Sequence, residues 1–380
     1  MTTDYSSQWA QEFPLQEDLI HLNHAAVGPW PQRTVNAVTQ FAQENSQRGS
    51  LHYPKWVETE NRLRQRLGRL INAAADDIAL VKNTSEALSM VAWGIDWQPG
   101  ENVVISDEEF PSNRIVWESL KSRGVEVREV ALHDNLTSPA AALIAATDAQ
   151  TRLLSISSVQ YASGLRMDLN TLGKHCRAHD ILFCIDAIQS LGALRFDVQS
   201  CGADFVMADG HKWMLGPEGL AMFYTHPGSR ERLRLFEYGW HMVEHSGEFD
   251  RREWEPAHSA RRFECGSPNM LCTHALNASL SLLEEIGLDC IEEQVLANSQ
   301  HMFDLIEYLD NLELVTDNSP EQYAGIVTFR HRSIPAEKLY RQLMDQRVLC
   351  AQRGGGIRFS PHFYTPWTKI QQALQLANAN

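Results

Sequence analysis

Two polar residues that each follow an apolar run, Asp186 and Lys212, are the clearest sign of chemistry in this sequence. Asp186 ends the run ILFCID, and Lys212 lies just beyond DFVMAD. A lysine amine becomes a nucleophile when burial or neighbouring charges lower its pKa, and it can then form a Schiff base. A buried carboxylate needs a positive partner, such as a protonated pyridine nitrogen. Together the two groups are what pyridoxal phosphate (PLP) requires of a protein.

Each of these residues also has a purely structural interpretation. Lys212 could be a surface lysine in a loop, and Asp186 could be the N-cap of a helix. Lys212 is flanked by Gly210, His211 and Trp213, and it lies at the end of a strand-like run. This setting favours the catalytic interpretation.

Other polar residues could complete a cofactor site. Gln189, three residues after Asp186, could donate to the phenolic oxygen of the same ring. Thr84 and Ser85 follow a strand-like run and open a helical pattern, and the hydroxyl and N–H groups of a helix N-terminus bind phosphate. His211 could add a further donor. Because any Ser or Thr N-cap gives the same pattern, this signal is weak by itself.

An aromatic residue and an arginine extend the candidate site. Phe110, in DEEFPSN, could stack on the cofactor ring or could be an ordinary core aromatic. Arg358, in GGGIRFSPHFY, could bind a substrate carboxylate through a two-pronged contact or could lie on a strand edge. The preceding glycines permit a tight turn or a close backbone approach.

Two further sequence patterns resemble a zinc site and a nucleotide-binding loop, but neither is complete enough to predict such a site. The segment HMVEH, from His241 to His245, matches a zinc pattern that needs a helix to place both histidines on one face. Gly239 and Gly247 bracket it, and the surroundings are typical of a loop, so we expect no metal. The Gly-Gly-Gly run has the form of neither a dinucleotide fingerprint nor a P-loop.

Short apolar runs alternate with helical patterns between about residues 75 and 225. This alternation predicts an α/β fold with a largely parallel sheet, in which sites form beyond the carboxyl ends of the strands. The strand-like runs are IALVKN (78–83), ENVVISD (101–107), VEVREV (125–130), TRLLSISSV (151–159), ILFCID (181–186), DFVMAD (204–209) and LAMFY (220–224).

The pattern changes after residue 270. A long helical stretch covers about residues 273–312, with a break near Gly287, and shorter strands and helices follow. We therefore expect a large α/β domain over residues 20–255. A smaller α+β domain would comprise residues 1–19 and 256–380.

Composition and charge exclude several classes of protein. The net charge of −15 argues against nucleic acid or an anionic membrane as the main partner, since both need a basic face. The sequence has no apolar run of transmembrane length, and its start does not resemble a secretory signal. The seven cysteines are scattered without a CxxC motif, as expected of free thiols in a reducing cytoplasm.

With these residues in view, the chain resembles the class V aminotransferase family of PLP enzymes. That family includes cysteine desulfurases, C–S lyases and isopenicillin N epimerase. The resemblance extends from LNHAAVGPWP (22–31) to RFSPHFYT (358–365). Its most specific parts are DAIQS (186–190), DGHKW (209–213) and RRFECGSPN (261–269), in this order.

The resemblance implies a PLP fold-type I architecture, with a mostly parallel seven-stranded sheet, and a homodimer with active sites at the subunit interface. It implies that Lys212 binds the cofactor, that Asp186 faces the pyridine nitrogen and that Arg358 binds the substrate carboxylate. The other cofactor-binding positions that match are Thr84, Ser85, Phe110, Gln160, Gln189, His211 and Ser267, the last reaching the partner's phosphate. His24 and Ala25 match the segment that lines the substrate pocket.

Two departures from the family pattern matter. Asp209 stands where many relatives have Ser or Thr as a phosphate ligand, so its carboxylate should point away, be protonated or accept from a neighbouring donor. Desulfurases carry a cysteine on a loop just before the carboxylate-binding arginine, whereas this chain has AQRGGGIRFS. Cys350 lies eight residues before Arg358, in a strand-like run. The persulfide mechanism needs a mobile thiolate, so we expect no desulfurase activity.

These observations predict a PLP-dependent enzyme that acts at the α-carbon of a small amino acid. A lyase reaction of the β-elimination type is the first hypothesis, because such lyases do not need the missing cysteine. An aminotransferase with a keto-acid acceptor is the second, and an amino-acid epimerase is the third. A non-catalytic interaction protein on the same fold is a hypothesis of a different class, and intact Asp186 and Lys212 argue against it.

Overall fold

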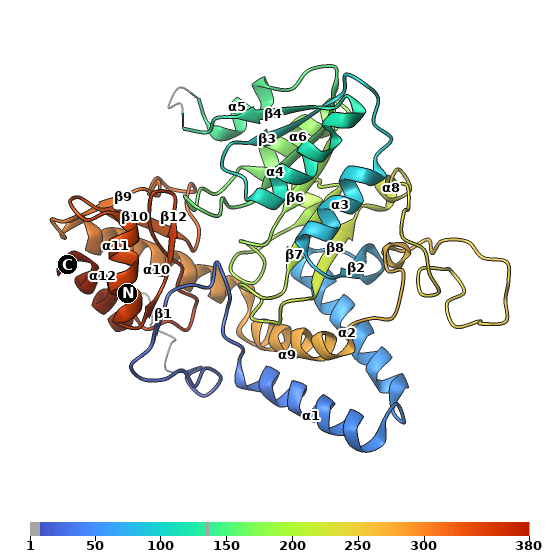
Figure 1. Ribbon diagram of the computed structural model, residues 1–380, viewed down its shortest axis with the longest axis horizontal. Helices are drawn as coiled ribbons and strands as arrows, with labels where there is room; N and C mark the ends of the chain where they lie inside the picture. The colour runs from blue at the N-terminus through green and yellow to red at the C-terminus, as the bar shows by residue number, and fades with distance from the viewer. Residues whose placement is uncertain (1–7, 134–136, 380) are drawn as a thin grey trace.

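The structure is a computed structural model that describes residues 8–133 and 137–379. Its centre is a seven-stranded sheet (Figure 1). The strands are β2 (Ile78–Val81), β3 (Asn102–Ser106), β4 (Glu126–Val130), β5 (Thr151–Ser157), β6 (Leu182–Asp186), β7 (Phe205–Asp209) and β8 (Ala221–Thr225). Their order is β2-β8-β7-β6-β5-β3-β4, and only β8 is antiparallel to its neighbours. All seven predicted runs form strands, so the predicted α/β fold is confirmed.

Both faces of this sheet are buried. Its helices are α2 (Tyr53–Ile71), α3 (Thr84–Gly94), α4 (Pro111–Glu118), α5 (Pro139–Ala145), α6 (Leu169–Ala178), α7 (Val198–Cys201), α8 (Pro227–Arg230) and α9 (Met270–Ile286). Along β3, Val104 belongs to one apolar core, and Val103 and Ile105 belong to another. The first core includes α2, α5, α6 and α9, and the second includes α3 and α4. Burial on both faces explains why the inner strands are mainly apolar, whereas the edge strand β4 is partly exposed and carries three charged residues.

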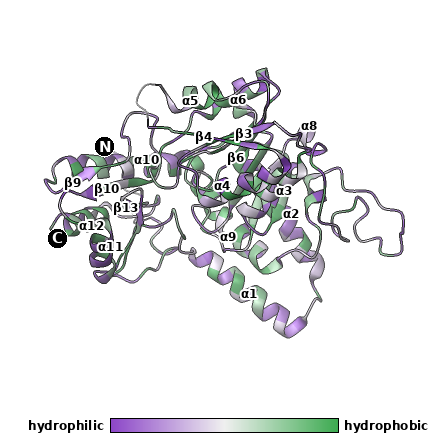
Figure 2. Cartoon of the chain, turned by 45° about the horizontal axis from the view of Figure 1, so that its top comes forward, coloured by the Kyte–Doolittle hydropathy of each residue, from purple (hydrophilic) through white to green (hydrophobic). Residues whose placement is uncertain are grey.

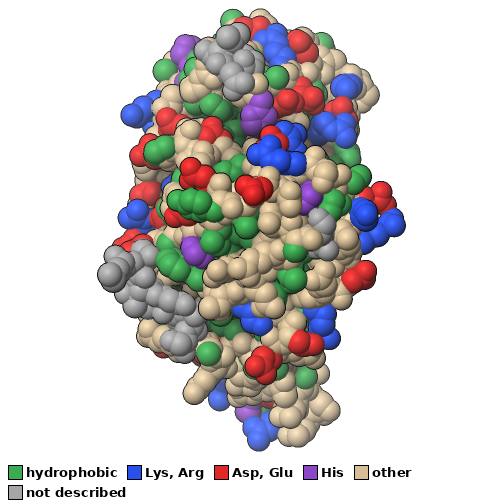
Figure 3. Space-filling view, turned by 90° about the vertical axis from the view of Figure 1, so that its left-hand side faces the viewer, with side chains coloured by type: hydrophobic (Ala, Val, Ile, Leu, Met, Phe, Trp, Pro, Cys, Tyr) green, Lys and Arg blue, Asp and Glu red, His purple; other side chains and the backbone are tan. Residues whose placement is uncertain are grey.

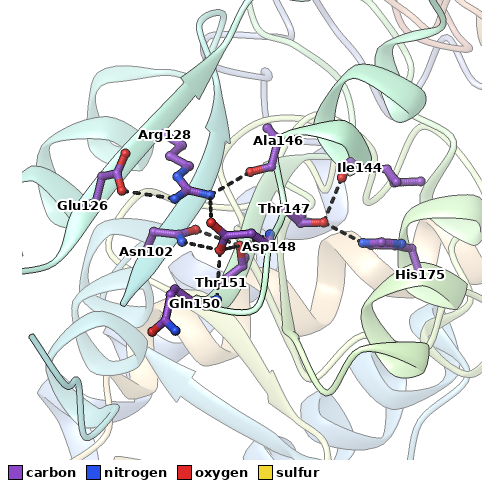
Figure 4. A network of polar contacts seen from close by, with 10 residues as sticks. All are labelled: Asn102, Glu126, Arg128, Ile144, Ala146, Thr147, Asp148, Gln150, Thr151 and His175. Atoms are coloured by element: carbon purple, nitrogen blue, oxygen red, sulfur yellow. Dashed lines mark hydrogen bonds and ion pairs between the residues drawn. The ribbon is translucent and has the colours of Figure 1, made fainter. Parts of the chain in front are cut away.

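Polar side chains fix the register near the amino ends of β3, β4 and β5 (Figure 4). Thr151 Oγ1 donates to Asn102 Oδ1 at 2.8 Å, and Asn102 Nδ2 donates to Asp148 Oδ1 at 3.0 Å. Arg128 forms an ion pair with Asp148 at 2.8 Å. These polar groups stabilise the amino edge of the sheet. Ligand sites in such folds form at the opposite, carboxyl edge.

A second, antiparallel sheet forms a smaller α+β part of the molecule, at the left of Figure 1. Its elements are β9 (Leu312–Leu314), β10 (Val327–His331), β12 (Ala351–Arg353), β13 (Gly356–Phe359), α10 (Leu288–Glu307), α11 (Ala336–Asp345) and α12 (Trp367–Ala379). The strand order is β12-β13-β10-β9, and the three helices share one apolar core with the strands. β1 (Ile20–His21) pairs with β11 (Val348–Leu349), which ties the beginning of the chain to this part.

The expected break near Gly287 is confirmed, because α9 ends at Ile286 and α10 begins at Leu288. α9 packs against α2 and against α1 (Gln32–Arg48), whose alternating hydrophobic and hydrophilic residues are visible in Figure 2. The division into residues 20–255 and 256–380 with 1–19 stays a prediction, and residues 1–7 lie outside the described part. From the packing of α9 we propose that the smaller domain begins at Gly287.

Acidic, basic and hydrophobic side chains are interspersed over the face of the smaller part shown in Figure 3. A single-sign patch of the kind that binds nucleic acid is therefore not seen on this face. Among the described residues, no helix combines the length and the apolar character needed to cross a membrane.

Candidate active site

The carboxyl edge of the large sheet brings together residues that the sequence singled out. β2, β6 and β7 run in the same direction, because β8 is antiparallel to both β2 and β7. Asp186 and Asp209 are the last residues of β6 and β7, and Thr84 opens α3 shortly after β2. These side chains therefore lie at one edge of the sheet, where the fold type places its ligands.

Lys212 lies in the turn between β7 and β8, and close packing fixes its backbone. Gly28 N donates to His211 O at 2.8 Å. A Cβ on Gly28 would lie 2.4 Å from Lys212 O, and one on Gly192 would lie 2.3 Å from Trp213 O. Only glycine permits such close approaches. The segments around these two glycines therefore set the position of the lysine.

The amine of Lys212 is suited to nucleophilic attack. Burial is the main cause that lowers its pKa to about 8; the carboxylate of Asp186 opposes this shift, and the charge of Arg358 adds to it. Its Nζ lies 5.9 Å from the centre of the Phe110 ring. Within residues 8–133 and 137–379, no hydrogen bond or ion pair engages Nζ. A lysine with a lowered pKa and no competing partner can react with an aldehyde.

Asp186 is a buried carboxylate with two neutral donors. Asn113 Nδ2 donates to its Oδ2 at 2.8 Å, and Ile188 N donates to its Oδ1 at 2.9 Å. Burial raises the pKa of Asp186, and the two donors oppose this shift. A pyridinium nitrogen would supply the cationic partner that neutral donors do not. The sequence interpretation missed Asn113, although it follows Phe110 by three residues in the segment DEEFPSN.

The two glutamines expected near the ring differ in what their amides bind. Gln189 Nε2 donates to Ala25 O at 3.1 Å, and Gln189 Oε1 accepts from Trp213 Nε1 at 2.9 Å. Both ends of that amide therefore have protein partners. Gln160 Nε2 donates to Glu109 Oε1 at 3.0 Å, whereas Gln160 Oε1 is buried without a partner. Gln160 thus has the freer amide for contact with a ring substituent.

Glu109 is a buried acid that the sequence interpretation missed. It accepts from Ser157 N at 2.8 Å and from Ser157 Oγ at 2.5 Å, besides its bond from Gln160. Burial raises its pKa to about 7; the bonds from Ser157 and Gln160 oppose the rise, and the charge of Asp186 adds to it. The available signal was its place directly before Phe110. Glu109 links a group that titrates near neutral pH to the amide of Gln160.

The N-terminus of α3 has the features expected of a phosphate cup. Thr84 Oγ1 is buried and has no partner among the described residues. Asn83 Oδ1 accepts from Glu86 N at 2.9 Å and caps the helix, while Ser85 Oγ donates to Ser112 Oγ at 2.9 Å. An unpartnered hydroxyl at a helix N-terminus is suited to bind an anion.

Asp209 faces His211, with its Oδ1 3.0 Å from Nδ1 of the imidazole. The two side chains are only 8% and 15% exposed. The carboxylate of Asp209 is therefore turned toward the imidazole of His211.

Arg358 is a buried cation with no carboxylate partner in residues 8–133 and 137–379. Its Nη1 donates to Tyr161 O at 2.7 Å, and its Nη2 donates to Asn23 Oδ1 at 3.4 Å. Its Nε is buried and unpartnered, and burial lowers the pKa of the group to about 10, with the charge of Arg353 adding to the shift. A guanidinium that is held by neutral acceptors can still bind a carboxylate.

The remaining predicted residues lie farther from the amine or are engaged by the protein. His24 is fully buried, with Nδ1 2.9 Å from Ser360 O and Nε2 2.6 Å from Tyr364 Oη. Ala25 bonds to Ser360 through its N–H and to Gln189 through its carbonyl. We therefore expect both to support the pocket wall. Ser267 is exposed and lines a separate cavity of about 300 Å³, whose lining does not include Lys212.

The segment from His241 to His245 forms no helix, so its two histidines do not share a helical face. His241 does lie near Glu60 and Glu264 with spacing that would suit a metal. However, the guanidinium of Arg64 already bonds to Glu60 at 2.5 Å and to Glu264 at 2.5 Å. A cation therefore already balances this acidic pair. The absence of a metal from the working enzyme stays a prediction.

Pyridoxal phosphate fits the residues at this edge of the sheet. Among the buried polar atoms without a hydrogen-bond partner in the described part of the chain, Thr84 Oγ1 suits a phosphate and Gln160 Oε1 suits a ring substituent. The amine of Lys212 suits the aldehyde, the carboxylate of Asp186 suits the ring nitrogen, and Phe110 suits the ring face. The chemistry of this set of donors and acceptors therefore matches the cofactor.

Comparison with known proteins agrees with this geometry. The model of the family described as aminotransferase class V matches residues 20–363. A probable cysteine desulfurase of Methanothermobacter thermautotrophicus is 29% identical over 95% of this chain and 94% of its own length. Isopenicillin N epimerase of Streptomyces clavuligerus is 27% identical over 96% of both chains.

Solved structures show the same fold. The cystine C–S lyase C-DES, in complex with its product cysteine persulfide, superposes with a TM-score of 0.89 and 23% identity, covering 96% of this chain and 99% of its own. A lysine-to-alanine mutant of C-DES with glycine covalently linked to the PLP cofactor gives a TM-score of 0.90 and 22% identity, covering 97% and 98%. The protein belongs to the class V aminotransferase family, and it is a PLP-dependent enzyme of fold-type I.

Proposed function

We propose that this enzyme is a lyase that acts at the α-carbon of an amino acid and eliminates a group from the β-carbon. The observation that carries the proposal is the amine of Lys212, which is buried, has a pKa lowered to about 8 and lacks a bonding partner among the described residues. When bound, pyridoxal phosphate supplies an aldehyde that links to amines and a ring that accepts electrons.

Lys212 is the proposed residue that links the cofactor and then moves the α-proton. A pKa of about 8 leaves part of the amine neutral near neutral pH, as a general base requires. Asp186 would hold the proton of the ring nitrogen through its charge. Arg358 would bind the α-carboxylate and turn the α-proton toward Lys212, which lowers the entropic cost of the proton transfer.

The environment of the cysteines supports a lyase rather than sulfur transfer through an enzyme persulfide. That transfer needs an accessible thiolate. Cys350 is buried, and burial raises the pKa of its thiol to about 12. The turn between β12 and β13 consists of Gly354 and Gly355, which leaves no loop for another cysteine. Elimination needs neither a thiol nor a loop.

Epimerisation is the second candidate, favoured by the similarity to isopenicillin N epimerase. It would use the same Lys212 but would need a second acid–base group on the opposite side of the α-carbon. Transamination would also use Lys212, and it would need a keto acid as the second substrate.

The test begins with the cofactor and proceeds to turnover. Purified enzyme incubated with pyridoxal phosphate should absorb in the visible range, and borohydride should fix a pyridoxyl group on Lys212, as read by peptide mass spectrometry. Lys212→Ala should lose both signals. A wild-type protein that stays colourless and unlabelled would rule out the proposed role of the lysine.

A screen of amino acids separates the three reactions. Elimination releases ammonia and a keto acid without any acceptor, transamination requires an added keto acid, and epimerisation exchanges the α-proton and inverts the centre without release. We expect ammonia and keto acid from one class of substrate. Turnover that strictly requires an added keto acid would replace the lyase assignment by an aminotransferase.

We also propose that the enzyme is a homodimer located in the cytoplasm. Several exposed aromatic residues belong to the long segment between α8 and α9, whose backbone extends to the right in Figure 1. Tyr238, Trp240, Phe249 and Trp254 are 61%, 42%, 80% and 60% exposed. A second subunit would remove them from water, and aromatic residues are enriched in such interfaces. Light scattering with Phe249→Ser tests the dimer.

The proposed location in the cytoplasm is supported by the cysteines. All seven are unpaired, as expected in a reducing compartment.

A further inference from the structure

A second arginine lies beside Arg358 on the same face of the small sheet. In the hairpin of β12 and β13, Ala351 pairs with Arg358, and Arg353 pairs with Gly356. Paired residues of antiparallel strands share a face, and so do residues two apart on one strand. Arg353 is therefore the diagonal neighbour of Arg358, at about 7–8 Å for such positions. Gly356, opposite Arg353, adds no side chain between them.

This face of the hairpin covers the segment around Gln160 in the large domain. Arg358 Nη1 donates to Tyr161 O at 2.7 Å, and a Cβ on Gly354 would lie 3.4 Å from Ala162 O. The ring of Tyr161 packs edge-on against that of Phe110, with centres 5.2 Å apart. The hairpin thus lies against the same segment that borders the amine of Lys212.

The charge of Arg353 reaches the active site. It contributes to the lowered pKa of Lys212 and also to the lowered pKa of Arg358. The carboxylates that act on Lys212 from the large domain, those of Asp186 and Asp209, are both buried and have the opposite effect on its pKa. Two arginines therefore lie close enough to Lys212 for their charges to act on its amine.

Arg353 has no acidic partner among the described residues. Within the described part of the chain, its side chain makes one hydrogen bond, from Nη1 to the neighbouring Gln352 O at 2.8 Å. Arg330, which continues the same row across β10, is by contrast paired with Glu313 at 2.6 Å. Of the two exposed arginines in this row, only Arg353 keeps its full charge available to a ligand.

We propose that the substrate is an α-amino acid whose side chain ends in an anionic group, and that Arg353 is the residue that selects this group. The inference rests on the proposed function, in which Arg358 binds the α-carboxylate. One carboxylate accounts for one arginine, and a second anion accounts for the other. A carboxylate or sulfinate on a short side chain would reach Arg353, because the long arginine side chain can span the diagonal.

The experiment compares amino acids of the same shape that differ in charge. Aspartate is compared with asparagine, and glutamate with glutamine, by the change in cofactor absorbance as each is titrated into the holoenzyme. Succinate and butyrate, which lack the amine, are compared by calorimetry as ligands that do not react. The variants are Arg353→Gln, Arg353→Lys and, as a matched control on the same row, Arg330→Gln.

The wild type should bind the acidic member of each pair more tightly, and it should bind succinate more tightly than butyrate. Arg353→Gln should remove this preference, with a loss of about fivefold for the acidic ligand, as for a partly exposed ion pair. Binding of the neutral ligand should not change. Arg353→Lys should restore part of the preference, and Arg330→Gln should leave it intact.

Failure of the selectivity inference can be distinguished from failure of the proposed function. If neutral and acidic amino acids perturb the cofactor spectrum equally, or if Arg353→Gln weakens both alike, the selectivity inference is overturned while the proposed function stands. If no amino acid perturbs the spectrum of a holoenzyme that borohydride labels on Lys212, the proposed reaction at the α-carbon fails first.

Discussion

Replacing Gly28 by alanine tests whether a backbone contact positions the reactive amine. The added Cβ would lie 2.4 Å from Lys212 O and 3.0 Å from Leu215 Cδ2, whereas ordinary contact begins at 3.4 Å. Relief of the closer clash requires a shift of about 1 Å in the segment that carries the lysine. Overpacking of this size costs about 1–3 kcal/mol of stability. A misplacement of about 1 Å costs about 100-fold in rate.

The assay follows the fixation of pyridoxal phosphate by borohydride, turnover, and unfolding in urea. Gly28→Ala should remain folded, with its free energy of unfolding lowered by about 1–3 kcal/mol, and should turn over about 100-fold more slowly. Val27→Ala is the control, because Val27 is adjacent and 48% exposed. The reasoning is refuted if Gly28→Ala is destabilised as expected but reacts as fast as the wild type.

Three further outcomes are expected from the electrostatics of the site. The pKa of Glu109 in the folded protein, about 7, lies above its ordinary 4.5, so stability should fall by about 3 kcal/mol as pH rises from 4.5 to 7. In Glu109→Gln, the free energy of unfolding measured in urea should depend much less on pH over this range. The pKa of Lys212, about 8, lies below its ordinary 10.5, so the cofactor-free protein should gain about 3 kcal/mol between pH 8 and 10.5. A gain that persists in Lys212→Met would contradict the assignment. Asp209→Asn should weaken binding of inorganic phosphate to the cofactor-free protein about tenfold, because the imidazole of His211 loses the carboxylate that lies 3.0 Å from its Nδ1 and orients the ring. Unchanged affinity in calorimetry would remove Asp209 from the phosphate site.

Much of the fold could be predicted because burial on both faces leaves a strong mark in the sequence. Most strands of the large sheet are mainly apolar runs bounded by polar residues, and the edge strand β4, EVREV, is the exception. Since parallel strands end at one edge, the polar residues that end these runs had to gather there. The positions of Asp186 and Asp209 at this edge are predictable in this sense, because the end of a strand can be identified from the local sequence without knowing which distant segments contact it.

Contacts between distant segments were not readable from the sequence. Gln189 looked free to bind the ring, yet its amide bonds to Ala25, 164 residues earlier in the chain. Glu109 looked like one more acid in a polar segment, yet it is buried against Ser157, 48 residues away. Local patterns state which residues end a strand, whereas the pairing of side chains depends on which loops meet above the sheet.

The distribution of charge explains why so acidic a protein can hold anionic ligands. The chain has a net charge of −15, but the carboxylates at this edge of the sheet already face protein groups: Asn113 donates to Asp186, and Nδ1 of His211 lies 3.0 Å from Asp209 Oδ1. The cations lack acidic partners among the described residues, since Arg358 binds neutral acceptors. A cofactor phosphate and a substrate carboxylate would therefore meet donors whose charge has not been neutralised. Because such attraction acts over a Debye length, cofactor uptake should slow as salt is added, despite the overall negative charge.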